Sequence, residues 1–355
     1  MSDEEGPDVS ATSKATTRKG NENPSTEANN VDHSKTKPAS AWGTHDATEW
    51  IGIIRVCSDA LRELNGPDIP TPVHLVVAIK ETNETTMFQV LHGPPELNHR
   101  AVLQSYFQSS ISTVGLYEQW SKEDKRRLAR IAQCIPGVRL IDQDPWECLI
   151  TFICSTNNNI PRITKMVTAL RRTYGTPLMT IGDETLYSFP SFCDLQTRAT
   201  DAKLRELGMG YRAKYIIKTL EILESLGGEP YLWSLREISD ADEVQEKLIQ
   251  FAGVGRKVAD CVALFSLKQT EAVPVDVHVW RIARRDYDKD GVLATVKSIT
   301  PRVYQQVVNL FRSRFTTAAG WAHSLLFIAE LPSFRPVLPQ DMVDEMEDFE
   351  KKQQK

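Results

Sequence analysis

Hydrophobic and polar residues alternate with two different periods along the chain, and the change of period divides it into two regions. A period of two recurs around Trp50–Val56, His74–Lys80 and Thr86–His92, with Gly, Pro and Asn between these runs. That period places every second side chain on one face of a strand, so the runs predict a small antiparallel sheet. From Pro95 to about Ala329 the hydrophobic positions recur with the helical period instead. We therefore expect an α+β chain, with a small N-terminal antiparallel sheet domain packed on an all-helical domain.

The two ends of the chain differ from both of these regions. Residues 1–44 are rich in Ser, Thr and Asn and poor in hydrophobic residues, and residues 336–355 are acidic. We interpret both as disordered tails, which leaves a sheet domain at 45–94 and a helical domain at 95–335. No hydrophobic run approaches the roughly 20 residues of a membrane-spanning helix. The acidic N-terminal region also lacks the pattern of a secretory signal or a transit peptide, so we expect no membrane partner.

Composition and charge narrow the class of protein. A chain of 355 residues that is 41% hydrophobic and 25% charged has room for two globular domains. Its six cysteines have no paired spacing, which is typical of reduced intracellular thiols. The net charge of −5 does not indicate nucleic-acid binding, but the two tails account for all of it. The remaining body is neutral and keeps local basic stretches, one of which contains Arg162, Lys165, Arg171 and Arg172.

The strongest motif lies between residues 239 and 286. Ser239, followed three residues later by Asp242, has the capping-box pattern of a helix start. That helix ends at Gly253-Val254-Gly255, and a second helical run begins at once. Two helices joined by so short a turn form a helical hairpin, because glycine adopts positive φ. The backbone N–H groups at the start of the second helix are then exposed, and Gly253, Gly255 and Val258 become candidates for phosphate binding.

Two charged residues of this region suit covalent catalysis. Lys257 lies in the first turn of the second helix, where a positive charge is disfavoured by about 0.3–1 kcal/mol, so the neutral nucleophilic amine is favoured. Cys261 follows four residues later on the same face. Asp276 is the predicted N-cap of a helix that runs to Arg285, and its carboxylate could stabilise a cationic transition state or take a proton. Alternatively, the lysine is merely solvated and the aspartate is only a cap.

Together, the hairpin, the lysine and the capping aspartate resemble the helix-hairpin-helix, Gly/Pro-rich loop, Asp motif of DNA glycosylases. More narrowly, GVGRKVADC followed by AVPVDVHVWRIARRDY resembles eukaryotic 8-oxoguanine DNA glycosylase, and the likeness extends over about residues 48–333. The resemblance implies excision of 8-oxoguanine opposite cytosine from duplex DNA by a nuclear, monomeric protein. It implies a Schiff base on Lys257 that permits β-elimination, with Asp276 supporting the charge. It implies no cofactor or metal, and since no cysteine follows Cys261, a C-terminal iron–sulfur cluster is not expected.

The resemblance also implies a set of binding residues. Asn157 and Arg162 match the residues that contact the orphaned cytosine, Tyr211 matches a wedge in the base stack, and Arg212 joins the cytosine contacts. An alternative places Tyr211 in the hydrophobic core. His278 belongs with the hairpin among the expected DNA contacts. The expected pocket for the flipped base is lined by Pro274, Asp276, His323, Phe327, Cys261 and Phe265.

This sequence departs from the family pattern in three places. His323 stands where the family has a base-binding glutamine, and a histidine could titrate in the working pH range. We expect the neutral form to be the useful one, with weaker lesion binding as the pH falls. Phe265 replaces a methionine, and Phe251-Ala252 replaces Leu-Pro. No Gly-Gln-x-Phe-Arg-Trp strand, whose glycine reads the oxidised base, occurs between Met1 and Trp50. A glycosylase for another lesion and a DNA-binding module without chemistry therefore remain alternatives.

Overall fold

The described residues form two compact units, of which unit 1 contains strands and a helix and unit 2 is helical. Met1–His99 and Asn158–Pro190 form unit 1, and Arg100–Asn157 and Ser191–Lys355 form unit 2. The predicted α+β class is confirmed. The computed structural model describes residues 43–46, 49–56, 72–81, 86–288, 290–293 and 296–353. Residues 1–42, which hold most of the predicted N-terminal tail, lie outside the described residues.

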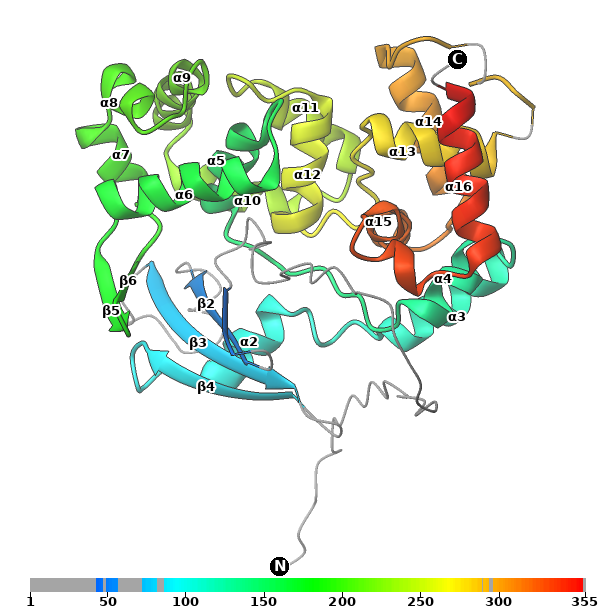
Figure 1. Ribbon diagram of the computed structural model, residues 1–355. Helices are drawn as coiled ribbons and strands as arrows, with labels where there is room; N and C mark the ends of the chain where they lie inside the picture. Colours follow the sequence, from blue (N-terminus) through cyan, green and yellow to red (C-terminus); the bar gives the residue numbers. More distant parts are fainter. Residues whose placement is uncertain are drawn as a thin grey trace, which may run out of the picture. The chain divides into compact units, whose positions relative to one another are not determined.

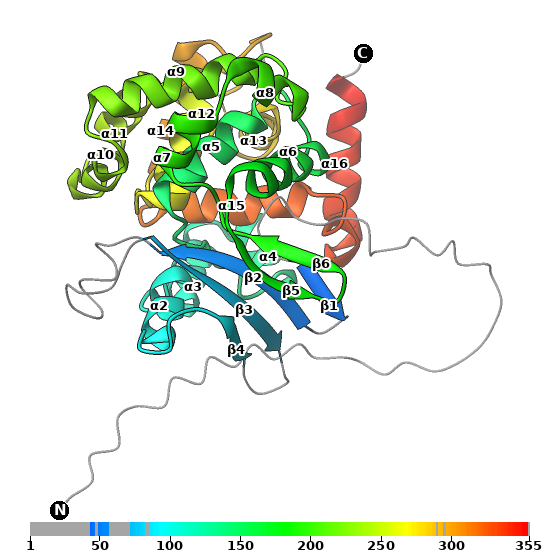
Figure 2. The same cartoon turned by 90° about the vertical axis from the view of Figure 1, so that its left-hand side faces the viewer.

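Unit 1 contains an antiparallel sheet with the strand order β1-β2-β3-β4, in which the strands lie side by side (Figures 1 and 2). The register pairs Ile54 with Leu75 and Gly52 with Val77, and Leu75 and Val77 are fully buried. The three strands predicted from the period of two are confirmed, and one further strand precedes them. The strands are β1 (Gly43–Asp46), β2 (Glu49–Val56), β3 (Val73–Glu81) and β4 (Thr86–His92).

Unit 1 also contains a helix and a hairpin from the middle of the chain. Helix α6 (Ile160–Tyr174) is followed by strands β5 (Pro177–Ile181) and β6 (Glu184–Tyr187). We predicted uninterrupted helical structure here, and the hairpin is a difference. Its turn is Gly182-Asp183, in which Gly182 has a φ of +57°, and short Gly/Asp turns of this kind match the twist of a two-stranded ribbon. Residues 158–190 therefore group with the sheet rather than with the helical domain of our prediction.

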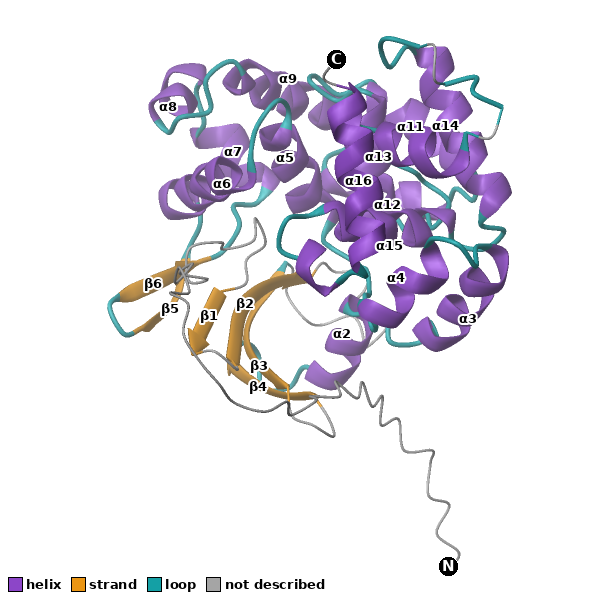
Figure 3. Ribbon diagram, turned by 45° about the vertical axis from the view of Figure 1, so that its right-hand side comes forward, coloured by secondary structure: helices purple, strands orange, loops and turns teal. Residues whose placement is uncertain are grey.

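Unit 2 is helical (Figure 3), and within it α5 packs against α12. Helix α5 is buried on several sides, as its uniformly hydrophobic sequence predicted, with Trp146, Leu149 and Ile153 at or below 1% exposure. Asp144 caps its first turn by accepting a bond from the Glu147 N–H at 2.9 Å. The α-helices of unit 2 are α2 (His99–Tyr106, whose first residue belongs to unit 1), α3 (Thr113–Glu123), α4 (Leu128–Cys134), α5 (Pro145–Ser155), α7 (Phe192–Arg198), α8 (Asp201–Glu206), α9 (Arg212–Ser225), α10 (Glu229–Ser234), α11 (Ala241–Ile249), α12 (Arg256–Ser266), α13 (Val277–Ile282), α14 (Pro301–Arg314), α15 (Ala319–Glu330) and α16 (Gln340–Gln353). Three short helical turns accompany them: η2 (Leu235–Glu237), η3 (Ala283–Tyr287) and η4 (Arg335–Val337).

Helix α16 occupies most of the stretch that we predicted to be a disordered acidic tail. Two methionines anchor it, because Met342 is 0% and Met346 is 2% exposed. Its carboxylates also form ion pairs with arginines of other helices, such as the pair between Asp341 and Arg130. Composition alone could not predict this helix, since both stabilising contacts join residues that are far apart in the sequence.

Candidate active site

The predicted helical hairpin is formed by α11 and α12. Asp240 is the N-cap of α11 and accepts a bond from the Asp242 N–H at 2.9 Å, so the helix starts one residue later than the Ser239 cap that we predicted. Val244 and Leu248 are fully buried on the predicted face. The hairpin therefore stands on a hydrophobic base, which fixes the turn between the two helices.

The two glycines of the turn have different structural roles. Gly253 has a φ of +78°, and a Cβ added there would lie 2.4 Å from Cδ2 of Tyr215, so a larger residue does not fit. Gly255 is exposed, has an ordinary φ of −90°, and would meet no atom within 4 Å. It is the N-cap residue of α12 and supplies no side-chain cap. The first N–H groups of α12, up to Val258, therefore meet the geometric requirement of an anion site.

The charges of Lys257 and Asp276 influence the pKa values of the same two side chains. Lys257 is half-buried in the first turn of α12, and Asp276 is half-buried at the start of α13. The charges of both residues influence Cys261 and His323. Burial raises the pKa of the Cys261 thiol to about 12, although the charge of Lys257 opposes this shift. Because of this raised pKa, Cys261 is a buried, protonated thiol at neutral pH.

Asp276 is the N-cap of α13, as predicted. One carboxylate oxygen, Oδ1, accepts bonds from the backbone N–H groups of His278 at 2.9 Å and of Val279 at 3.0 Å. Both capping bonds use Oδ1, so capping fixes the orientation of the carboxylate while it engages a single oxygen. The side chain of His278 is exposed.

His323 lies inside the site, and its burial contradicts one expectation. The residue is 5% exposed, and burial lowers the pKa of its imidazole to about 4, although Asp276 opposes this shift. The prediction of a charge change in the working pH range is therefore wrong. Nδ1 lies 3.4 Å from the Gly320 carbonyl oxygen, which can only accept, so Nδ1 carries the proton in that contact. Nε2 is then an acceptor, and it is buried without a hydrogen-bond partner among the described residues.

Aromatic rings surround this histidine and the far end of α12. The Phe327 ring lies 6.3 Å from His323 and 6.0 Å from His278 between centroids, and it is half-buried. Phe265 is half-buried and stacks on Phe152 with centroids 5.7 Å apart and an interplanar angle of 15°. Pro274 is buried. Of the predicted pocket residues, His323 and Phe327 are in direct contact, and the charge of Asp276 influences both Cys261 and His323.

A buried polar network behind α12 was not predicted from the sequence. Asp260 accepts bonds from Gln245 at 2.7 Å and from the Tyr304 hydroxyl, and Gln245 in turn accepts from Arg256 at 2.8 Å. Burial raises the pKa of Asp260 to about 6. The network joins α11, α12 and α14, and it therefore positions the helix that carries Lys257. The only sequence signal was an aspartate in the middle of an otherwise hydrophobic helical run.

The predicted wedge and cytosine contacts of unit 2 form a second cluster. Tyr211 is 43% exposed, so the alternative that placed it in the core is wrong. Arg212 is 1% exposed, and its guanidinium donates to the carbonyl oxygens of Thr156 and, at 3.0 Å, of Asn157. Asn157 is exposed with a φ of +46°. Arg212 thus holds the backbone of this turn, whereas our prediction gave it a base contact.

Arg162, the other expected cytosine contact, belongs to unit 1. It is exposed in the first turn of α6, and its backbone N–H donates to the Asn159 cap at 3.1 Å. Arg171 of the same basic stretch is 7% exposed and lies 5.9 Å from the Phe189 ring centroid. The stretch therefore offers some of its charges to solvent, and Arg171 packs inside unit 1.

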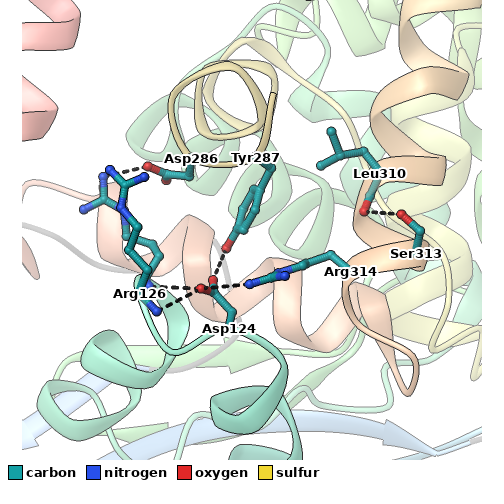
Figure 4. Close-up of a pocket in the computed structure, with 8 residues that line it drawn as sticks. Asp124, Arg126, Asp286, Tyr287, Leu310, Ser313 and Arg314 are labelled. Atoms are coloured by element: carbon teal, nitrogen blue, oxygen red, sulfur yellow. Dashed lines mark hydrogen bonds and ion pairs between the residues drawn. The ribbon is translucent and has the colours of Figure 1, made fainter. Parts of the chain in front are cut away.

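A cavity of about 430 Å³ lies elsewhere in unit 2 (Figure 4). None of the predicted site residues lines it, so it is not the candidate active site. Within the described ranges, no group of His, Cys, Asp or Glu residues could hold a metal ion, and no helix is long and hydrophobic enough to span a membrane. The cavity is lined by Asp124, Arg126, Arg127, Asp286, Tyr287, Leu310, Ser313 and Arg314.

Comparison with known proteins gives matches over most of the chain. The family model "8-oxoguanine DNA glycosylase, N-terminal domain" matches residues 38–149, and "HhH-GPD superfamily base excision DNA repair protein" matches residues 150–297. The chain is 43% identical over 238 residues to "N-glycosylase/DNA lyase OGG1" of Arabidopsis thaliana. It is 39% identical over 251 residues to "N-glycosylase/DNA lyase" of Saccharomyces cerevisiae. These matches cover 66% and 64% of this chain, but only 63% and 66% of the two relatives, slightly less than two thirds of each.

The fold also matches solved structures. An 8-oxoguanine glycosylase/lyase of Clostridium acetobutylicum, in complex with double-stranded DNA containing cytosine opposite 8-oxoguanine, superposes with a TM-score of 0.63. The superposition covers 81% of this chain and 87% of that protein, at 24% sequence identity. At this identity the likeness establishes the fold alone.

Proposed function

This chain belongs to the eukaryotic 8-oxoguanine DNA glycosylase family, and we propose that it excises an oxidised purine from duplex DNA and then cleaves the strand. The observation that carries the proposal is the placement of Lys257 in the first turn of α12, whose N-cap Gly255 leaves the N–H groups open, together with Asp276, whose carboxylate is oriented by the backbone at the start of α13. It supports one reaction centre built from the starts of two helices. A module that only binds DNA would not require this arrangement of amine and carboxylate.

The chemistry begins with a base outside the duplex. A stacked base hides its glycosidic bond, so the nucleotide must first be flipped into the pocket. The Lys257 amine then attacks the anomeric carbon of the sugar, and the glycosidic bond breaks with its electrons passing to the departing base. Positive charge develops on the sugar in this step, and the oriented carboxylate of Asp276 stabilises it. Of the two protons that the amine loses, one passes to the departing base and the other to the sugar O4′ as the C1′–O4′ bond breaks, which leaves an imine between Lys257 and the opened sugar.

The imine then permits strand cleavage. It acidifies the sugar C2′ protons, so that loss of one of them expels the 3′ phosphate by β-elimination. Every group that this sequence requires is supplied by the DNA, by water and by Lys257 and Asp276. We accordingly propose that the protein uses no cofactor, acts as a monomer and works in the nucleus.

Residues of each unit are available for contacts with the DNA. The open N–H groups at the start of α12 support binding of a backbone phosphate near Gly255, and the exposed His278 supports a second contact. The exposed ring of Tyr211 is available as a wedge, with Arg212 bracing the turn that presents Asn157. Arg162 is exposed and available for the partner cytosine.

His323 determines which lesion fits, and it supports a second candidate function. Its Nε2 can accept one N–H of a guanine-type base, with Phe327 beside it for stacking. An amide would offer a donor and an acceptor, so this pocket recognises fewer features of the base. We propose 8-oxoguanine opposite cytosine as the substrate. Excision of another damaged base is the alternative that the single buried acceptor favours.

The test is a panel of duplexes that each carry one defined lesion, assayed for base release and for nicking. Borohydride reduces an imine, so it should trap a covalent protein–DNA adduct on the 8-oxoguanine duplex. Lys257→Gln should abolish the adduct, because an amide cannot form the imine. Lys218→Gln changes a lysine of α9 that pairs with Glu221 on the surface, and it should trap as the natural protein does. Equal trapping by Lys257→Gln contradicts the assignment.

A further inference from the structure

Helix α16 lines up its carboxylates against arginines from other parts of unit 2. Asp341 binds Arg130 of α4 through both oxygens, at 2.6 and 2.8 Å. One turn further on, Glu345 lies 3.3 Å from Arg127 and 3.7 Å from Arg126. Near the end of the helix, Glu350 pairs at 2.9 Å with Arg281 and at 2.5 Å with Arg335, and Gln353 accepts a bond from Arg284 at 2.7 Å.

Four of these arginines form a row that we call the arginine face: Arg126, Arg130, Arg281 and Arg284. Arg127 is not part of it, because its side chain is 4% exposed and also pairs at 2.7 Å with the buried Asp286. The row extends along α16, from α4 at one end of that helix to α13 and η3 at the other (Figure 1). Its α13 end is continuous with the candidate active site, because Asp276 and His278 begin the helix that carries Arg281. A duplex bound at the start of α13 would therefore have this row of positive charge beside it.

Helix α16 covers the arginine face without sealing it. The side chain of Arg126 is 70% exposed and that of Arg130 is 35% exposed, although both pair with α16. Arg126 and Arg127 also line the 430 Å³ cavity, which contains Arg314 on its other side (Figure 4). The ion pairs on this side of α16 are thus partly solvated, and solvated ion pairs contribute little to stability.

The composition of α16 makes it a competitor for the same positive charges. It carries six acidic residues and two lysines in 14 residues. Met342 and Met346 are its buried residues, and Val343 and Phe349 are half-buried. The B-form duplex presents one phosphate charge per about 1.7 Å of its axis, a far denser anion than the helix. Such a polyanion can therefore compete with the carboxylates of α16 for the exposed arginines.

We infer that the arginine face is an additional binding surface for the DNA backbone, and that α16 occupies it when no DNA is bound. The inference rests on the proposed function, which makes duplex DNA the partner. It adds a contact surface outside the base pocket. It also assigns α16 a function, namely to lower the affinity of the protein for undamaged duplex.

The experiment compares binding of an undamaged duplex across a salt series by three full-length proteins. One is the natural protein. The second carries Asp341→Asn, Glu345→Gln and Glu350→Gln, which removes the carboxylates that face the arginines. The third carries Asp344→Asn, Glu347→Gln and Asp348→Asn, acids whose described partners belong to α16 itself. Both variants lose three negative charges, so net charge alone affects them equally.

We expect the arginine-facing variant to bind undamaged duplex about tenfold more tightly than the solvent-facing variant at low salt. Each arginine that gains a phosphate contact raises the slope of log affinity against log salt by about 0.9, so we expect a slope steeper by about two or more. Adding Arg281→Gln and Arg130→Gln to the arginine-facing variant should reverse both changes. Superimposed curves for the two triple variants would overturn the inference.

A second measurement uses the natural protein and guards against a variant that does not fold. Amide hydrogen exchange across residues 340–353 should accelerate when saturating undamaged duplex is added, because α16 leaves its site. Unchanged protection of these amides in the complex would overturn the displacement. Neither experiment involves base excision, so a negative result here leaves the Lys257 trapping result to decide the proposed function separately.

Discussion

Two helices of the candidate site, α12 and α13, begin in opposite ways. Helix α12 starts after Gly255, which has no side chain to offer its first N–H groups. Helix α13 starts after Asp276, whose Oδ1 accepts bonds from two of the corresponding N–H groups. The two starts influence the same neighbours, Cys261 and His323, so the difference between them is a difference within one site.

This difference shows how one backbone feature can be used for two purposes. Glycine at an N-cap is less stabilising than Asp or Asn by only a few tenths of a kcal/mol, so α12 can keep its donors open for a ligand. The Lys257 amine lies in the same first turn, beside these open N–H groups. At α13 the first N–H groups donate to the Asp276 carboxylate instead, and these bonds hold that carboxylate in a fixed orientation. The predictions below alter one start at a time.

The largest effect is expected at the start of α13. Asp276→Asn keeps a good N-cap and removes the negative charge that would stabilise the transition state. We expect base release in single-turnover assays to slow by about 10²- to 10⁴-fold, a range typical of lost electrostatic or acid–base catalysis. The free energy of unfolding should change by less than about 0.5 kcal/mol.

Asp276→Ala separates the two roles of this residue. It removes the cap as well as the charge, so it should lower the free energy of unfolding by about 1 kcal/mol and slow base release as much as asparagine does. An asparagine variant with an unchanged rate, or one as unstable as the alanine variant, would show that Asp276 is only a cap.

The sequence predicted both helix starts because each depends on residues next to it. The Gly-x-Gly turn, the position of Lys257 in the first turn and the capping role of Asp276 are set by a few consecutive residues. The three strands of unit 1 were equally predictable from a short period of alternation. Even here the boundaries shifted, since the cap of α11 is Asp240 and not Ser239.

Apart from the β5–β6 hairpin, whose turn is local, the main features that the sequence did not predict depend on distant residues. Helix α16 is held by arginines that lie about 70 to 210 positions earlier in the chain. The sequence predicted that Arg212 contacts DNA, but its guanidinium donates to the carbonyl oxygens of Thr156 and Asn157, more than 50 residues earlier in the chain. The charge state of His323 depends on burial, which local pattern does not reveal. Site chemistry was therefore predictable to the extent that it is local.

A smaller effect is expected when the start of α12 is made to resemble that of α13. Gly255→Asn supplies a side-chain cap at a position with open space and an ordinary φ, so it should raise the free energy of unfolding by a few tenths of a kcal/mol. The added cap competes with phosphate for the same N–H groups, and duplex affinity should fall by about three- to tenfold, measured with Lys257→Gln protein. Gly137→Asn, at a surface turn with no atom near a Cβ, is the control and should bind DNA normally, although its φ of +77° makes this substitution the more strained of the two. Unchanged affinity in Gly255→Asn would mean that no phosphate binds at this start.

The smallest effect on DNA recognition concerns His323, whose pKa is influenced by the charges of Lys257 and Asp276. Asp276 raises the pKa of this imidazole and Lys257 lowers it, while burial dominates and sets it at about 4. His323 is then neutral from pH 5.5 to 8, so discrimination between 8-oxoguanine and guanine should not depend on its titration in that range. An NMR titration should place the His323 pKa below 5, shifted further down by Asp276→Asn and up by Lys257→Gln. Opposite or absent shifts would show that the two starts do not share this neighbour.

The same titration has a consequence for stability whose direction is fixed. The unfolded chain binds a proton at His323 near pH 6.5 and the folded chain only near pH 4, so the unfolded state is favoured progressively as the pH falls between these values. The full shift corresponds to about 3 kcal/mol, and it should be absent from His323→Gln. Comparing unfolding of the two proteins at pH 7.5 and pH 4.5 isolates this histidine, because the buried His74, whose pKa is lowered to about 3, is present in both. An equal loss of stability in both proteins would mean that His323 is accessible to protons in the folded state, and the pocket that it closes would then be open to water.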